Sequence, residues 1–266
     1  MIKDINLGQF YPTSSLLHNL DPRTKILGLF GFMMSLFIIN QGWGYAAVTG
    51  FALAMVALSR VPIAMVVRSL RPILLILVFT VLAHLFFTTG RVWVEWGPLQ
   101  ITYEGAQLAL FMLVRLVLLV VVASLLTYTT TPLDLTDGLE TLLRPLNRLG
   151  VPAHELAMMV VIAIRFVPTL LEEADKIMKA QMARAARFDQ GGLLTRAKSL
   201  VPLLVPLFVS TFRRADDLAI AMEARCYRGG QGRTRMRQLA MAACDYWALG
   251  IMAAWVVTVG VISVFY

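Results

Sequence analysis

Two short basic segments carry the side chains of this sequence that are best suited to recognising a partner. Each has an arginine between two small residues, and the two triplets are Ala183-Arg184-Ala185 and Ala224-Arg225-Cys226. A second arginine follows each triplet, Arg187 in the first segment and Arg228 in the second. The planar guanidinium pairs bidentately with carboxylates, and small neighbours let a helix backbone approach an acidic groove closely. For either segment alone, a capping charge at a helix C-terminus is an even alternative. The presence of both favours two docking points.

Other chemistry finds little support in the sequence. The chain has no Gly-x-x-x-x-Gly-Lys-Ser/Thr loop for a nucleotide and no His-Glu-x-x-His zinc motif. His84 has no partner at ligand spacing, and His18 and His154 lie in polar segments. The two cysteines, Cys226 and Cys244, match neither a metal spacing nor a disulfide framework. We therefore predict no catalytic residue, no cofactor and no metal site.

Composition indicates a membrane protein. The 266 residues are 58% hydrophobic and 15% charged, with a mean hydropathy of +0.72. A soluble domain carries about 25% charged residues. The net charge of +8 comes without any lysine run, and the basic residues lie between apolar segments. We therefore predict a lipid bilayer as the surroundings and no nucleic-acid partner.

The apolar runs predict an all-α, polytopic fold with about five transmembrane helices. The five spans are residues 26–39, 43–59, 73–89, 108–126 and 247–266. The runs 156–171 and 200–212 are not counted, because Arg165 and Pro168 interrupt the first and two prolines interrupt the shorter second. The chain then divides into a four-span bundle (1–128), a cytoplasmic or interfacial section of coupling helices (129–242) and a last span (243–266).

The distribution of basic residues predicts the orientation. Six of them precede the first span or lie between spans two and three, while the loop between spans three and four has only Arg91. Short cytoplasmic loops carry the excess of lysine and arginine. The N-terminus is therefore expected in the cytoplasm, together with residues 129–242, and the C-terminus outside. Arg115 stands within span four, where a functional role, snorkelling to the interface and pairing inside the bundle all remain open.

Three helices are expected in the cytoplasmic section. The first is amphipathic, spans residues 132–148, has Thr131 as its N-cap and ends at Gly150. The second and third span residues 153–188 and 193–228. Each begins apolar and finishes charged on one of the two Ala-Arg triplets, so the arginines are predicted at the water-exposed ends of membrane-facing helices.

At this point the residues carry a family resemblance. The two triplets, with Leu20-Asp21-Pro22-Arg23-Thr24-Lys25 before the first span, resemble the transmembrane T component of energy-coupling factor transporters, the EcfT and CbiQ family. The resemblance covers essentially the whole chain. Ala185 and Cys226 stand where the family pattern has glycine, and both are small.

The resemblance implies a non-catalytic, multi-pass subunit of an ABC-type importer for vitamins or metal ions in the cell membrane. It implies that the arginines dock into two cytoplasmic ABC ATPase subunits, which hydrolyse the ATP. A membrane-embedded S component would bind the substrate. A membrane scaffold or adaptor without a transport role is the alternative.

The predicted orientation is tested by cysteine labelling, after the native Cys226 and Cys244 are replaced by serine. A cysteine placed near Val92 should react with an impermeant maleimide on intact cells. A cysteine placed near Gln190 should react only after permeabilisation. The reverse pattern would refute the orientation.

Overall fold

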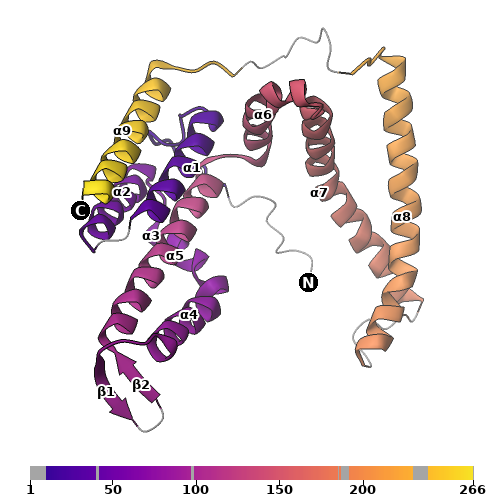
Figure 1. The fold of residues 1–266 in the computed structure, drawn as a ribbon. Helices are drawn as coiled ribbons and strands as arrows, with labels where there is room; N and C mark the ends of the chain where they lie inside the picture. The colour runs from indigo at the N-terminus through magenta and orange to yellow at the C-terminus, as the bar shows by residue number, and fades with distance from the viewer. Residues whose placement is uncertain are drawn as a thin grey trace. The chain divides into compact units, whose positions relative to one another are not determined.

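The computed structural model describes residues 10–39, 42–96, 99–184, 186, 192–229 and 239–265. The described chain is helical, as predicted, and divides into two compact units (Figure 1). Among the described residues, the bundle unit comprises those from 10 to 141 and from 239 to 265, and the two-helix unit comprises those from 142 to 229. The predicted division by membrane location remains a prediction.

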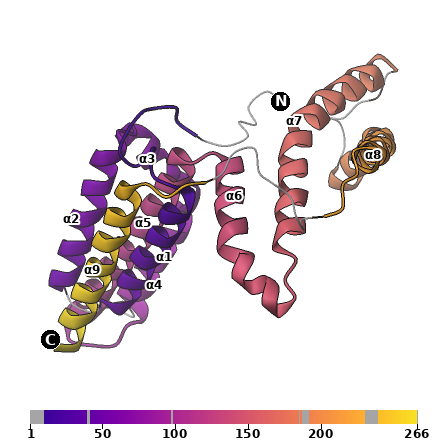
Figure 2. The same cartoon turned by 90° about the horizontal axis from the view of Figure 1, so that it is seen from above.

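The bundle unit is built from apolar helices packed side by side. In chain order its elements are α1 (Pro22–Ile38), α2 (Gly42–Ser59), α3 (Ile63–Ser69), η1 (Arg71–Ile73), α4 (Leu74–Phe87), α5 (Tyr103–Thr129), most of α6 (Pro132–Leu143) and α9 (Ala243–Phe265). Figures 1 and 2 show α1, α2, α5 and α9 alongside one another. Phe32 and Leu36 of α1 and Val48 of α2 are fully buried in their shared core.

Five helical segments are long and apolar enough to cross a membrane, which agrees in number with the prediction. They are Gly42–Ser59, Ile63–Phe87, Tyr103–Thr129, Ala153–Ala183 and Ala243–Ser263, among the residues described. Their membership differs from the prediction. The 17-residue α1 falls short in length, although Phe32 and Leu36 lie fully buried in the bundle core. The helix at Ala153–Ala183 qualifies by length and composition, and its location outside the bilayer remains a prediction.

The third predicted span begins earlier than expected. The helical segment starts at Ile63 rather than near residue 73, and the 3₁₀ turn η1 at Arg71–Ile73 interrupts it. Pro72 has no backbone N–H to give, so the α-helical hydrogen bonding breaks there. After α4, a small antiparallel hairpin of β1 (Val92–Trp96) and β2 (Leu99–Thr102) leads into α5. This hairpin was not predicted from the sequence.

A buried carboxylate ties two ends of the bundle unit's chain together. Asp245, at the start of α9, is only 2% exposed. Its Oδ1 accepts a hydrogen bond from the backbone N–H of Asp21 (2.8 Å), and its Oδ2 accepts one from the backbone N–H of Ala242 (2.8 Å). Asp21 in turn caps α1, accepting from the Arg23 N–H at 2.9 Å. Thus the first turn of α9 fixes the start of α1.

Lys25 joins the same end of the bundle unit to α5. Its Nζ donates to the carbonyl oxygen of Thr129 (2.9 Å) and to that of His18 (3.1 Å). The His18 ring lies in the N-terminal segment, where its Nε2 donates to the Tyr11 carbonyl at 3.0 Å. Burial lowers the pKa of His18 from its usual value of 6.5. The Leu20–Lys25 motif is therefore an anchor for three helices.

Arg115 pairs inside the bundle unit, one of the alternatives left open by the sequence. Its Nη2 donates to the carbonyl oxygen of Ile39, the C-cap of α1, at 3.0 Å. The guanidinium also lies 5.7 Å from the ring centroids of Phe37 and Tyr45. This geometry satisfies an orphan helix carbonyl in an apolar setting.

The two-helix unit contains η2 (Arg144–Leu149), α7 (Ala153–Ala183) and α8 (Leu193–Ala224). The predicted helix over 132–148 is wrong in its last five residues: α6 ends at Leu143 and a 3₁₀ segment follows, since Pro145 lacks an N–H. The predicted N-cap at Thr131 and the glycine stop at Gly150 are confirmed. Thr131 Oγ1 accepts from the Asp134 N–H (3.2 Å), and Gly150 adopts φ +86°.

Removing the Asp245 carboxylate should destabilise the bundle unit. Asp245→Ala leaves the buried Asp21 N–H and the partly buried Ala242 N–H without acceptors and should cost about 2 kcal/mol. Asp245→Asn keeps one acceptor oxygen and should lose about half of that. The melting temperature of the detergent-solubilised protein should be highest for wild type, lower for Asp245→Asn and lowest for Asp245→Ala. Equal melting temperatures for all three would contradict the anchoring role.

Candidate docking site at the ends of α7 and α8

Helices α7 and α8 run antiparallel, with contacts near both ends and in the middle. The Tyr227 hydroxyl donates to the Met158 sulfur at 3.3 Å, and Gln181 Nε2 donates to the Pro202 carbonyl at 3.3 Å. Figure 1 shows the C-terminal part of α7 meeting the first part of α8, while the other ends of the two helices lie further apart. The stretch of α7 from Met158 to Gln181 spans about 35 Å at 1.5 Å per residue.

Both helices end in the same capping geometry. Arg184 is the C-cap of α7 (φ −89°, ψ 19°) and Arg225 the C-cap of α8 (φ −93°, ψ 14°). Beyond each arginine, a backbone N–H returns to the third carbonyl before the cap. These bonds are Ala186 to Gln181 and Tyr227 to Met222, each 3.0 Å long. This is the hydrogen bond of the Schellman motif, and it ends the helices earlier than the predicted residues 188 and 228.

Cys226 occupies a backbone position that normally selects glycine. Its φ of +56° lies in the left-handed region, and its N–H bonds the Glu223 carbonyl at 2.8 Å, which completes the Schellman motif. A side chain costs energy in this conformation. The positive φ at this position therefore explains why the family pattern has glycine here. Ala185, the matching residue of the first triplet, and Arg187 lie outside the described residues.

The predicted docking residues that the structure describes are all exposed. They are Ala183, Arg184, Ala224, Arg225, Cys226 and Arg228. The structure does not bring the two triplets together. Arg184 follows Gln181, which contacts Pro202 in the first half of α8, whereas Arg225 precedes Tyr227, which contacts Met158 near the start of α7. The arrangement therefore provides two separate basic ends rather than one basic patch.

The equivalent caps belong to an internal repeat, which was predicted from the sequence only as a similar arrangement. Residues 173–187 align with 214–228 without a gap. Identical residues stand at six equivalent positions, namely Ala174/Ala215, Asp175/Asp216, Ala180/Ala221, Ala183/Ala224, Arg184/Arg225 and Arg187/Arg228. A self-comparison of the sequence would have revealed it. Equivalent sequences explain the equivalent caps.

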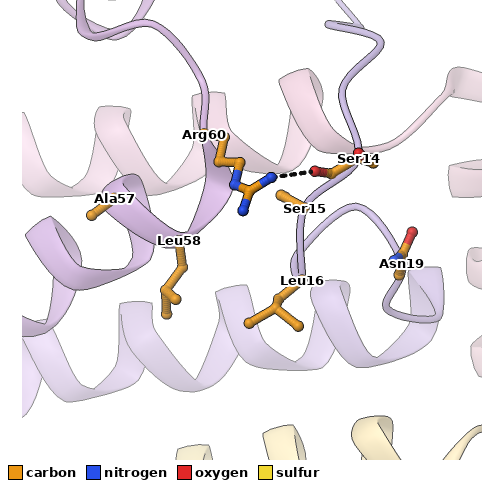
Figure 3. A pocket seen from close by; sticks show the side chains of 7 residues that line it. All are labelled: Ser14, Ser15, Leu16, Asn19, Ala57, Leu58 and Arg60. Carbon is orange, nitrogen blue, oxygen red and sulfur yellow. Dashed lines mark hydrogen bonds between the residues drawn. The ribbon is translucent and has the colours of Figure 1, made fainter.

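A shallow hollow in the bundle unit offers no comparable chemistry. It is lined by residues of the N-terminal segment and of the end of α2, and by Arg60 (Figure 3). The Arg60 guanidinium points at the Ser14 carbonyl, with Nη1 at 3.5 Å. The other lining residues are neutral, so the hollow holds no pair of groups for acid–base work.

Comparison with known proteins decides the family. The family model CbiQ, described as cobalt transport protein, matches residues 13–236, which include both triplets and all of α1 to α8. The chain belongs to the CbiQ family. The match extends over both compact units.

Three curated relatives, each named "Energy-coupling factor transporter transmembrane protein EcfT", are similar to this chain over nearly its whole length. A relative from Thermosediminibacter oceani is 55% identical over 255 residues, which is 95% of this chain and 96% of the relative. One from Ruminiclostridium cellulolyticum is 55% identical over 251 residues, 94% of each chain. One from Bacillus subtilis is 46% identical over 246 residues, 92% of this chain and 93% of the relative. The protein is thus a transmembrane component of an energy-coupling factor transporter, as the resemblance implied.

The capping role of residue 226 can be measured directly. Cys226→Gly should stabilise the end of α8 by about 1 kcal/mol, because glycine adopts positive φ without strain. Cys226→Val should destabilise it by about the same amount. Hydrogen exchange of the segment 222–227 reports both changes.

A matched control is Cys244→Gly. This second exposed cysteine lies inside the first turn of α9, where glycine should cost up to about 1 kcal/mol. Stabilisation by both glycine variants, or by neither, would contradict the capping assignment of Cys226.

Proposed function

We propose that this protein is the energy-coupling subunit of an ECF-type ABC importer. It transmits the motion of two cytoplasmic ATPase subunits to a membrane-embedded S component that binds a vitamin or a metal ion. The observation that carries the proposal is the pair of equivalent helix ends. Each presents an exposed arginine at its C-cap, and the two ends lie at opposite extremes of one antiparallel pair.

Docking rests on what a helix C-terminus and an arginine offer together. The guanidinium of Arg184 or Arg225 extends beyond the last turn and pairs with carboxylates in a groove of an ATPase subunit. The small residues Ala183, Ala224 and Cys226 allow the backbone of the last turn to enter the groove. Arg187 and Arg228 add further positive charge nearby. ATP hydrolysis belongs to the partner subunits, so this chain needs no catalytic residue.

The apolar surface of α8 suits a membrane partner. Between residues 200 and 212 it exposes seven large apolar side chains, among them Val201 (51%), Val205 (56%), Phe208 (59%) and Phe212 (67%). Exposed apolar area of this extent matches lipid or the apolar surface of the S component. Helix α8 therefore has an apolar half for the membrane side of the complex and a charged half that ends at the ATPases.

The proposed location is the cell membrane, with the N-terminus and both arginine ends in the cytoplasm and the C-terminus outside. The excess of basic residues before the first span and near the start of the third supports this orientation. The Asp245 anchor also supports it, because it places the first turns of α1 and α9 at the same end of the bundle unit. Both of these turns are on the cytoplasmic side in the proposed topology.

The proposal is tested by reversing the docking charges. Arg184→Glu and Arg225→Glu should each weaken the co-purification of the ATPase subunits and the uptake of substrate. The double variant should abolish both, since a glutamate in an acidic groove is repelled. Membrane insertion should stay normal.

Arg213→Glu provides the matched control, because Arg213 is also exposed but lies within α8, twelve residues before the docking Arg225. Normal ATPase co-purification and uptake in the double variant would refute the proposed function. Lost co-purification with unchanged uptake would favour a scaffold without a coupling role.

A further inference from the structure

Glu173 of α7 makes two contacts with α8 in the middle of the antiparallel pair. Its Oε1 accepts a hydrogen bond from the Ser210 hydroxyl. Its Oε2 lies 2.8 Å from Arg214 Nη2. The Glu173 side chain is 21% exposed and that of Arg214 is 44% exposed. Oε2 has no hydrogen-bond partner among the described residues, so the contact with Arg214 is an ion pair without hydrogen-bond geometry.

The ion pair joins equivalent positions of the internal repeat. Arg184 lies eleven residues after Glu173, and Arg225 lies eleven residues after Arg214. At 1.5 Å per residue, each docking arginine is about 16 Å from the contact. The contact is therefore equidistant from the two basic ends.

The charges at this place are reversed between the two copies of the repeat. Where α7 has Glu172-Glu173, α8 has Arg213-Arg214. The repeat keeps its charges at Asp175/Asp216 and at both arginine pairs, and reverses them once more at Lys176/Asp217. Opposite charges attract the two copies to each other at one register, whereas identical charges would repel. The reversal at Glu173 and Arg214 thus falls where the helices meet.

The stiffness of the helices changes at the same place. Pro168 of α7 and Pro206 of α8 lie shortly before the contact, and an internal proline removes a hydrogen bond and bends the helix. Between the contact and the arginines, neither helix has a proline or a glycine. Each helix therefore has a bendable part before the contact and a straight, uninterrupted arm after it.

We propose that Glu173, Ser210 and Arg214 form the pivot about which the two arms move when the ATPases displace the arginine ends. The three side chains are positioning residues: they hold the register of α7 and α8 and thereby the spacing of Arg184 and Arg225. This pivot rests on the proposed coupling function and names the residues that transmit the motion.

A charge swap tests the pivot in the complete transporter. Glu173→Arg and Arg214→Glu should each lower substrate uptake by about tenfold, a typical size for lost coupling between sites. ATPase co-purification should persist, because the docking ends are intact. The double variant Glu173→Arg/Arg214→Glu should restore most of the uptake. Glu172→Arg is the matched control, since it makes the same charge change one residue earlier on an exposed side chain, and it should leave uptake near wild type.

Spin labels at residues 183 and 224 give a readout that needs no ATPase. Each single reversal should broaden the distance distribution between the labels, and the swap should narrow it again. Uptake unchanged by the single reversals, or no rescue by the swap, would overturn the pivot. Distances that respond while uptake does not would also overturn it. Failure of the proposed function appears separately, as unchanged uptake in the Arg184→Glu/Arg225→Glu variant.

Discussion

The contact of Glu173 with Ser210 and Arg214 holds α7 and α8 in one antiparallel register. The positions of the two exposed arginines depend on that register, because each arginine is the last residue of an uninterrupted helical arm. An antiparallel pair places its two C-termini at opposite extremes, about 35 Å apart. One chain can then engage two copies of a partner at once, which a single basic patch cannot do.

The ends of the helices matter as much as their register. If α7 continued to residue 188 and α8 to residue 228, Arg184 and Arg225 would lie inside the last helical turn rather than at its end. The capping bonds from Ala186 and Tyr227 instead make Arg184 and Arg225 the C-caps. The last turn then presents its small residues and its guanidinium together. Membership of the CbiQ family and the similarity to relatives named EcfT indicate that these helix ends belong to a transporter component.

Local sequence patterns predicted the helical elements well. Long apolar runs, capping residues such as Thr131 and the glycine stop at residue 150 are local signals, and each appears in the structure. The two Ala-Arg triplets were predicted as exposed helix ends, and the described members are exposed at those ends. Helix boundaries were predicted wrongly where a proline or a left-handed residue ended a helix early.

Contacts between residues far apart in the chain could not be predicted from one sequence. Asp245 and Asp21 are far apart in the chain, and neither has a neighbouring pattern that names the other. Likewise, apolar periodicity gives the packed face of α7 but does not select Arg214 as the partner of Glu173. The charge reversal at these two positions is the sequence signal for that pair, and it becomes visible only once the repeat is aligned.

Separate contacts of the two arginine ends with the ATPases are the core of the proposed coupling. Photo-crosslinkers at Met182 and at Glu223, beside the two caps, test these contacts most directly in the purified complex, with Phe212 on the apolar face of α8 as the control position. Docking at both ends predicts a cross-link to an ATPase subunit from each of residues 182 and 223 and none from residue 212. Cross-links from only one end, or from neither, would contradict it.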